Sequence, residues 1–503
     1  MAEDNVSYTR HTLRGFGWLS GGAVLQSVLQ ITTLSVLARL LHPADFGIVN
    51  VAMILVGFST IFVDIGIGAS LVQLQNITPK HVYNGYIISI ILGIVIGGIF
   101  FLCAPLFAIY FKIQSATQVV RVFALYFPIR CFGIVPESLL QRNLQFKTTV
   151  SIQNISYLIG FGIISISCAY LGFGYWSLIY AQFGQLLIST TLLCYKQRIS
   201  FKEKFDLKLS KSLMFEGGGY SLATIFNFLA ENGDNMVVGR MLGAVQLGLY
   251  GRAFQLFALP ARFFGIIFDK LFFPILSRKR DDQATMDRLY MSSLVMCHFV
   301  VIPIAALLII LAPEVVTLLL GHGWEEIILP FQILAVSLSC RFGTKINKSF
   351  IKSLGIVYKG AVYQFGFCVM IVAFTVVGAY KGGLVGVAIG VLLANLINYI
   401  QTVLLIVRTI KSNFLYAVRI HLVAILLFAV LTFAIIAFVF MQRHFIHHYL
   451  WIIIISIIVI CPIALVLVLF LSKKFLTVDY LFIKQKISFS NRLITSIKTF
   501  FTR

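Results

Sequence analysis

The chain has 503 residues, of which 59% are hydrophobic and 12% are charged. A soluble globular domain carries about 25% charged residues, so this composition excludes a soluble enzyme and indicates a polytopic membrane protein. The net charge of +22 would suggest nucleic-acid binding in a soluble protein. In a membrane protein, basic residues gather in the cytoplasmic segments, so we expect no nucleic-acid partner.

Apolar stretches follow one another along almost the whole chain. A helix needs about 20 residues to span a hydrocarbon core of about 30 Å, and strand-like alternation is absent. The pattern therefore predicts an all-α fold of about 14 transmembrane helices. These lie at 15–38, 46–73, 83–111, 119–140, 149–171, 174–195, 213–239, 244–273, 289–320, 327–354, 358–380, 383–407, 418–440 and 449–472.

The basic residues are distributed unequally between the two sides of these spans. If the N-terminus is cytoplasmic, the outer segments hold only Arg39, Lys112, Arg240, Lys381 and Arg443. Most other Lys and Arg residues then fall on the inner side, as the positive-inside rule requires. An even number of spans places both termini in the cytoplasm.

The chain repeats itself on the two sides of a basic segment at 196–212. Residues 38–41 and 46–48 match residues 239–242 and 247–249 at a constant offset of 201 residues. Two shorter matches follow at offsets of 208 and 210: Ala104-Pro105 with Ala312-Pro313, and Phe132-Gly133 with Phe342-Gly343. Two halves of six spans each would insert in the same orientation. This predicts two lobes related by a pseudo-two-fold axis along the membrane normal, with the solute site between them.

The predicted organisation has five parts. They are an N-terminal lobe at 1–195, a cytoplasmic basic linker at 196–212, a C-terminal lobe at 213–410, two extra helices at 411–472 and a cytoplasmic tail at 473–503. The linker carries mostly basic charges, so we expect it to lie on the anionic inner leaflet. The tail mixes apolar and basic residues and is typical of an interfacial amphipathic segment.

Four cations lie at helical spacing inside the span at 327–354. Arg341, Lys345, Lys348 and Lys352 share one face of a helix, and Arg341 would sit about 21 Å from the outer end of a straight span. A charge at the centre of a bilayer costs about 2.5–3.5 kcal/mol unless it faces water or a partner. We interpret Arg341, Lys345 and Lys348 as the lining of a water-filled path for an anionic group, and Lys352 as a side chain that reaches the headgroups.

Other ionisable residues lie inside predicted spans, where they are candidates for function or for buried pairing. Arg130 and Glu137 share a helix face and are expected to pair, and Pro128 predicts a broken helix beside Arg130. Glu231 and Asp234 also share a face and are candidates for binding a coupling cation or a proton. The further candidates for substrate binding are Arg121, Arg130, Arg252 and Arg262, and those for ion coupling are Asp64 and Asp269.

Motifs for energy transduction, catalysis and metal binding are lacking. The chain has no GxxxxGK[ST] segment for ATP and no H-E-x-x-H or G-x-S-x-G segment. The eight Cys residues lie in or beside apolar segments without CxxC spacing, so they are interpreted as small hydrophobic residues. We expect a transporter rather than an enzyme, with no metal site and no cofactor other than a coupling ion, Na⁺ or H⁺.

Four stretches resemble the Wzx-like polysaccharide flippases of the multidrug/oligosaccharidyl-lipid/polysaccharide (MOP) exporter superfamily, most closely the colanic-acid and teichuronic-acid exporter branch. They are LSVLARLLHPADFGIVNVAMILVGFSTIFVDIGIGASLVQ (34–73), SLLQRNLQFK (138–147), NMVVGRMLGAVQLGLYGRAFQL (235–256) and LFFPILSR (271–278). The resemblance covers most of residues 10–410. It is less distinctive in the last two spans and the tail.

The resemblance implies a two-lobed fold of 14 helices with a central cavity and ion-coupled alternating access. It implies that an undecaprenyl-pyrophosphate-linked oligosaccharide moves from the inner to the outer leaflet of the bacterial inner membrane. In related flippases, cavity arginines are thought to meet the pyrophosphate. Arg341 stands where the family often has Arg, whereas Arg130 is not typical of it. The expected partners are the lipid-linked oligosaccharide, membrane lipids, and a polysaccharide polymerase with its chain-length machinery, and the expected state is a monomer.

Two alternatives remain at this point. A multidrug exporter of the same fold would require a mainly acidic, aromatic cavity, which the Lys and Arg residues oppose. A membrane polysaccharide polymerase or ligase would require a large outer loop with catalytic Arg and His residues. The predicted outer segments are short, which disfavours it.

Overall fold

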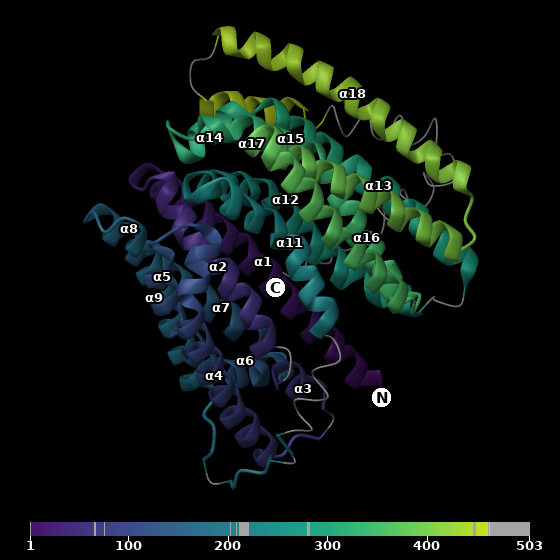
Figure 1. Ribbon diagram of the computed structural model, residues 1–503. Coiled ribbons are helices and arrows are strands. Elements are labelled where there is room, and N and C mark those ends of the chain that lie inside the picture. The colour runs from purple at the N-terminus through teal and green to yellow at the C-terminus, as the bar shows by residue number, and fades with distance from the viewer. Residues whose placement is uncertain are drawn as a thin grey trace, which may run out of the picture. The chain divides into compact units, whose positions relative to one another are not determined.

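The computed structural model describes residues 2–64, 67–74, 76–201, 203–207, 209–210, 221–278, 282–445, 449–460 and 462. The regular elements in this part of the chain are helices (Figure 1). The first part holds α1 (Ala2–Leu40), α2 (Pro43–Asp64), α3 (Ile67–Gln73), α4 (Pro79–Phe111), α5 (Ala116–Phe123), α6 (Tyr126–Arg142), α7 (Phe146–Ser156), the π-helix η1 (Tyr157–Ile163), α8 (Ile164–Tyr170) and α9 (Tyr175–Lys196). The second holds α11 (Ser221–Met241), α12 (Gly243–Arg278), α13 (Gln283–Ile310), α14 (Ala312–Leu320), the 3₁₀ turn η2 (Glu325–Ile327), α15 (Ile328–Val336), α16 (Leu338–Ser353), α17 (Val357–Thr409) and α18 (Phe414–Phe445).

The apolar character of these helices makes the protein a multi-pass membrane protein. Among the described residues nine helices are long and apolar enough to cross a bilayer, and a bent pair at Glu325–Ser353 would make ten. Helices satisfy their own backbone polar groups, which is why apolar stretches of this length adopt them in lipid. The all-helical prediction is confirmed. The count of 14 stays a prediction, because parts of the spans at 213–239 and 449–472 lie outside the described residues.

Two adjacent predicted spans form a single helical hairpin. The helix α17 covers 53 residues, but its backbone leaves helical geometry at Gly382 and Gly383, and Gly383 has φ of +56°. A Cβ on Gly378 would lie 2.1 Å from the carbonyl oxygen of Gly386. The backbones of the two arms therefore approach more closely than any side chain permits, and a left-handed residue at the turn favours glycine.

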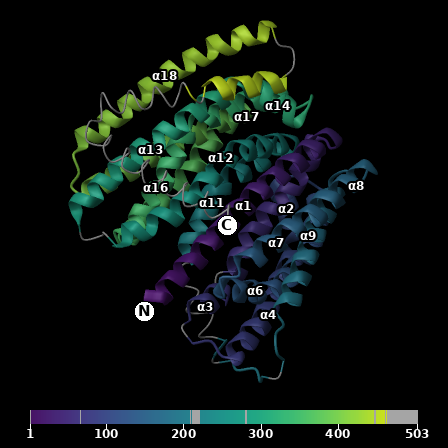
Figure 2. The ribbon, with the colours of Figure 1, turned by 180° about the vertical axis from the view of Figure 1, so that it is seen from behind.

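The chain divides into two compact units drawn from separate stretches. Unit 1 comprises Met1–Phe263, Leu319–Phe331 and Ala361–Ala394, and unit 2 comprises Phe264–Leu318, Gln332–Gly360 and Asn395–Arg503. In unit 1, α6 packs between α4 and α9 (Figures 1 and 2). In unit 2, α13 packs against both α16 and α18.

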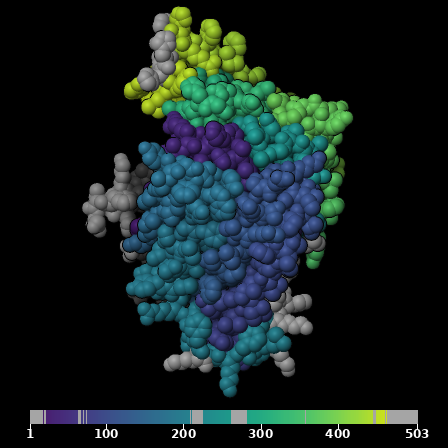
Figure 3. Space-filling view, turned by 60° about the vertical axis from the view of Figure 1, so that its left-hand side comes forward, coloured from purple at the N-terminus to yellow at the C-terminus, as the bar shows by residue number. Residues whose placement is uncertain are grey.

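The outer face of α4 shows what this part of unit 1 presents to lipid. Its exposed side chains are apolar and include Ile91, Ile94, Val95, Ile99, Leu102, Leu106 and Ile109. The blue and teal parts of the chain, which include α4 and α9, form one continuous surface in Figure 3. An exposed apolar surface of this extent is stable in a bilayer and would aggregate in water.

The start of α2 crosses the start of α12 within unit 1, and the contact is reciprocal. A Cβ on Gly47 would lie 1.8 Å from the carbonyl oxygen of Ala244, and a Cβ on Gly248 would lie 1.8 Å from the carbonyl oxygen of Pro43. Both pairs, Pro43/Ala244 and Gly47/Gly248, are separated by the repeat offset of 201 residues. Each helix contributes two small or compact residues four positions apart, which is the spacing that allows close helix approach in membranes. Reciprocal contacts of this kind are expected of two segments related by a local two-fold axis.

Candidate functional site

The helix α16 carries the predicted cation stripe within unit 2. Arg341, Lys345 and Lys348 are half-buried, and Lys352 one turn further on is exposed. The residues between them, among them Phe342, Ile346 and Phe350, are buried. The alternation follows the 3.6-residue period of the helix, so the cations share one face and the apolar residues pack on the other.

Polar contacts fix the orientation of α16 about its own axis. The Asn347 side chain accepts a hydrogen bond from the hydroxyl of Tyr290 on α13 at 3.1 Å and donates one to the hydroxyl of Thr402 on α17 at 2.9 Å. A Cβ on Gly343 would lie 2.2 Å from the Tyr399 ring, so α17 approaches the α16 backbone directly. The face of α16 that carries Gly343 and Asn347 is therefore held against α13 and α17. The three cations lie on the opposite face of the helix.

The span that carries the stripe is not straight. The segments Glu325–Val336 and Leu338–Ser353 meet at an angle of 44° at Ser337. The Ser337 hydroxyl donates to the carbonyl of Leu334 at 2.7 Å, and Ser side chains that bond back to the preceding turn bend membrane helices. The span predicted at 327–354 is therefore bent, and the depth of Arg341 does not follow from counting residues along one straight helix.

In unit 1, Arg130 pairs with Glu137 as its spacing predicts. The guanidinium donates to the Glu137 carboxylate at 2.8 Å, and both side chains are about one quarter exposed. The predicted break beside this pair is present but lies at Ala124–Leu125, between α5 and α6 and before Pro128. Proline cannot donate to the carbonyl four residues before it, and for Pro128 that residue is Ala124. The break therefore begins about one turn ahead of the proline, and α6 starts at Tyr126.

Arg252 on α12 lies in an apolar environment inside unit 1. Its guanidinium stacks 4.5 Å from the centre of the Phe46 ring and donates to the side chain of Gln255. Its Nε is buried and has no hydrogen-bond partner in the described part of the chain. A buried donor without an acceptor costs about 1–3 kcal/mol. Arg252 is therefore suited to bind an anionic group, to which Nε–H could donate.

The remaining predicted residues differ in how the structure places them. Arg121 is exposed, with its guanidinium 5.4 Å from the centre of the Phe101 ring on α4. Glu231 is exposed, whereas Asp234 is buried and accepts a hydrogen bond from the Tyr250 hydroxyl at 2.7 Å. The two acids therefore occupy different environments. The side chains of Asp64, Arg262 and Asp269 lie outside the described residues.

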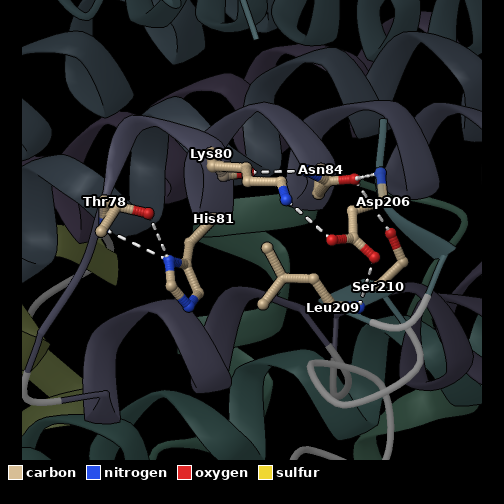
Figure 4. Close-up of polar contacts among 7 residues, drawn as sticks. All are labelled: Thr78, Lys80, His81, Asn84, Asp206, Leu209 and Ser210. Carbon is tan, nitrogen blue, oxygen red and sulfur yellow. Dashed lines mark hydrogen bonds and ion pairs between the residues drawn. The ribbon is translucent and has the colours of Figure 1, made fainter. Parts of the chain in front are cut away.

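Part of the predicted linker is attached to the start of α4 by contacts that the sequence does not reveal. The Lys80 ammonium pairs with the Asp206 carboxylate at 2.7 Å, and the Asn84 side chain accepts from the backbone N–H of Asp206 at 2.6 Å (Figure 4). The Ser210 hydroxyl donates to the same Asn84 oxygen at 3.3 Å. The Phe201 ring lies 5.8 Å from the ring of Tyr86. These residues are far apart in sequence, so no spacing pattern could have indicated them.

Comparison with known proteins places the chain in a family. Residues 36–329, more than half of the chain, match the family model described as "Polysaccharide biosynthesis protein". The chain belongs to the polysaccharide biosynthesis protein family. Two relatives are the lipopolysaccharide biosynthesis protein WzxC of Escherichia coli (strain K12), 24% identical over 81% of this chain and 83% of that protein, and the succinoglycan biosynthesis transport protein ExoT of Rhizobium meliloti (strain 1021), 25% identical over 80% and 81%.

Solved structures share the fold of this polysaccharide biosynthesis protein. The lipid II flippase MurJ, in an inward closed conformation, aligns with a TM-score of 0.69 at 14% identity over 92% of this chain and 99% of that one. An inward-facing multidrug resistance MATE transporter of the MOP superfamily aligns with a TM-score of 0.62 at 16% identity. At such identities the likeness establishes the fold alone.

For this family member the structure also records the arrangement of potential metal ligands. No three His, Cys, Asp or Glu side chains come together among the described residues. The described Cys residues are free thiols, and Cys297 on α13 is a buried example.

Proposed function

We propose that this protein is a secondary flippase. It moves an undecaprenyl-pyrophosphate-linked oligosaccharide across the bacterial inner membrane by alternating access, for the biosynthesis of a surface polysaccharide such as a lipopolysaccharide or exopolysaccharide. The family, the relatives named for polysaccharide biosynthesis and transport, and the fold of a lipid II flippase support this function. The protein acts as a transporter and not as an enzyme.

The observation that carries the proposal is the face of α16. Three cations, Arg341, Lys345 and Lys348, are held half-buried in a membrane-spanning helix whose other face is fixed by buried contacts. Charges inside a membrane-spanning segment are retained where they meet water or an opposite charge. A pyrophosphate presents several oxygens to guanidinium and ammonium donors through strong charge-assisted hydrogen bonds. Arg252, with its unpaired buried Nε, is a second candidate for such a contact.

The same face disfavours the multidrug alternative. A cavity for organic cations requires acidic and aromatic lining, whereas a cationic stripe repels such solutes. The MATE transporter shares the fold, but a shared fold does not transfer a substrate.

Ion coupling, orientation and partners belong to the same proposal. Asp234 is a buried acid with a described environment and is a candidate for binding Na⁺ or H⁺. Asp64, Glu231 and Asp269 remain further candidates. The distribution of Lys and Arg supports cytoplasmic termini. A polysaccharide polymerase with chain-length machinery is the expected partner, and the monomer is the expected unit.

The substitution Arg341→Ala tests the role of the stripe. Removing a charged hydrogen-bond donor costs about 1.5–3 kcal/mol, so the affinity for a lipid pyrophosphate should fall about ten- to hundredfold. The measurement is exchange of a fluorescent undecaprenyl-pyrophosphate disaccharide between leaflets of proteoliposomes, titrated with the probe. Lys352→Ala is the matched control, because Lys352 is exposed on the same helix. Equal loss in both variants, or none in Arg341→Ala, would remove Arg341 from the site.

A further inference from the structure

Four polar side chains form a continuous hydrogen-bonded chain inside unit 2. The Ser339 hydroxyl on α16 lies 2.7 Å from Nδ1 of His298 on α13, and Nε2 of His298 lies 3.1 Å from the hydroxyl of Tyr399 on α17. The Tyr399 hydroxyl lies 2.8 Å from Nε2 of His421 on α18, and Nδ1 of His421 lies 2.6 Å from the carbonyl oxygen of Ala417. We define these four side chains, Ser339, His298, Tyr399 and His421, as the histidine relay. It joins four helices of the unit.

The proton positions in the neutral histidine relay follow from its last acceptor. A carbonyl oxygen can only accept, so Nδ1 of His421 carries a proton and Nε2 of its neutral ring accepts from Tyr399. The Tyr399 oxygen then accepts from Nε2–H of His298. Nδ1 of His298 is left to accept from the Ser339 hydroxyl. In this state every hydrogen bond has one donor and one acceptor.

When one proton is added, the hydrogen bonds of the histidine relay can reverse without movement of its heavy atoms, because Ser339, Tyr399 and both rings can donate or accept. The neighbouring contact Tyr290–Asn347–Thr402 joins α13, α16 and α17 and is equally buried, but its direction is fixed by the amide of Asn347. A network that served packing alone would need only hydrogen bonds of fixed direction, such as those of Asn347. The histidine relay has a capacity for proton transfer that its neighbour lacks.

From this geometry we infer that the histidine relay binds and transfers the coupling proton of the transporter; this inference rests on the proposed function. A proton taken up at His298 makes that ring an imidazolium. Its Nε2–H proton passes to the Tyr399 oxygen while the Tyr399 hydroxyl proton passes to Nε2 of His421. His298 becomes neutral with its proton on Nδ1, which now donates to Ser339, and His421 holds the charge. Protons are conserved, and no redox step is involved.

The spacing of the rings fixes the stoichiometry at one proton. The His298 and His421 rings are 5.0 Å apart at their centres. Two imidazolium charges at that distance repel strongly in an apolar interior, so the pair titrates as one coupled unit. The further ionisable neighbours are Tyr290, Cys297 and Cys340, and these groups are neutral at pH 7.

Exposure indicates which end of the histidine relay is accessible. His298 is buried with 5% of its surface exposed, whereas His421 is half-buried. His421 therefore forms the accessible end of the histidine relay, and Ser339 lies at the other end on the helix that carries the cation stripe. Protonation reverses the hydrogen bond of Ser339 and so acts on α16 itself. Neither histidine is among the predicted site residues, although a histidine inside an apolar span is itself a signal.

The test uses the purified full-length protein in proteoliposomes with a fluorescent undecaprenyl-pyrophosphate disaccharide as probe. Exchange of the probe between leaflets is measured without a gradient, and its redistribution is measured with a pH gradient and with a Na⁺ gradient. The variants Tyr399→Phe, which breaks the transfer step but keeps both rings, and His421→Gln are compared with wild type. Tyr290→Phe is the matched control, because it removes one buried tyrosine hydroxyl from the neighbouring, non-reversible contact.

We expect wild type and Tyr290→Phe to redistribute the probe in response to the pH gradient. Tyr399→Phe and His421→Gln should lose that response while retaining gradient-free exchange, which shows that they are folded. The inference is overturned if both relay variants follow the pH gradient as Tyr290→Phe does, or if wild type exchanges the probe but responds to Na⁺ alone. Absence of exchange in wild type would overturn the proposed function itself.

Discussion

At the residue scale, Arg443 and Glu314 form an ion pair with two hydrogen bonds. Nε of Arg443 donates to one oxygen of the Glu314 carboxylate at 2.6 Å and its Nη2 donates to the other at 3.0 Å, while Glu314 is 3% exposed. Removing Arg443 leaves the buried Glu314 carboxylate without its charged partner; because the Arg443 side chain is itself 44% exposed, the cost should fall below the about 3–5 kcal/mol of a fully buried pair. Arg443→Ala should therefore lower the thermal unfolding temperature in detergent markedly. Arg443→Lys should lower the unfolding temperature less, because lysine keeps the positive charge although it cannot make the bidentate contact.

Arg419→Ala is the control for this prediction. Arg419 lies on the same helix, α18, and is exposed, so its removal should change stability little. If Arg443→Ala and Arg419→Ala unfolded at the same temperature, the contact between Arg443 and Glu314 would contribute nothing to stability.

Sequence spacing reveals residue contacts on one helix and not those between helices. Arg130 and Glu137 are seven positions apart on α6, so their pairing could be predicted, and the structure confirms it. Arg443 and Glu314 are separated by 129 positions, and nothing in the periodicity of either segment links them. The same holds for Lys80 with Asp206 and for the histidine relay.

The crossing of α2 and α12 makes a prediction at the scale of elements. A Cβ on Gly47 or Gly248 would fall 1.8 Å from a carbonyl oxygen of the facing helix, so Gly47→Ala and Gly248→Ala must each force the two helices apart. Overpacking of this kind typically costs about 1–3 kcal/mol. Because the contacts are reciprocal, the two variants should lose similar stability. Thermal unfolding of the purified variants measures this.

Gly98→Ala on α4 is the matched control, because a Cβ there meets nothing within 4 Å. It should leave stability unchanged or raise it slightly, since alanine favours helix more than glycine. Equal unfolding temperatures for all three alanine variants would contradict a close crossing.

Whole elements could largely be predicted from the sequence, and their interruptions could not. Apolar stretches of about 20 residues determine helices in lipid regardless of neighbours, so α4, α9 and α18 lie where the apolar stretches predict them. At the bend, the Ser337 hydroxyl bonds back to the preceding turn, and in the π-helical turn η1 the backbone at Gly160 lies against the backbone of α9 at Gln185. Such contacts are decided by packing, which a single sequence does not contain.

The orientation of the whole molecule gives a further prediction. The positive-inside rule places the loop that holds Glu325 outside and the loop that holds Asn143 inside, and both residues are exposed. In a cysteine-free background, Glu325→Cys should react with an impermeant maleimide in intact spheroplasts. Asn143→Cys should react only after permeabilisation. The reverse pattern would place both termini outside.

The predicted division into lobes at 1–195 and 213–410 stays a prediction at the scale of the whole molecule. The repeat at an offset of 201 residues predicts a reciprocal relation between two halves, and the Gly47 and Gly248 contacts agree with it. The two compact units, however, draw on separate stretches such as Ala361–Ala394 in unit 1 and Asn395–Arg503 in unit 2. Which distant segments pack together depends on long-range contacts, and these leave no periodic trace in the chain.

The glycine crossing also bears on the origin of the fold. If the two halves arose by duplication, Gly47 and Gly248 descend from one glycine, and Pro43 and Ala244 descend from the one residue four positions before it. In the half-length ancestor, that single pair would have made both contacts between two copies of the same chain. The ancestor was then a parallel homodimer, and fusion of its genes freed each copy to change. Asn50 and Gly251 are related by the same offset and touch across the crossing. They show that divergence, because one half carries an amide side chain and the other carries a glycine that leaves space for the amide.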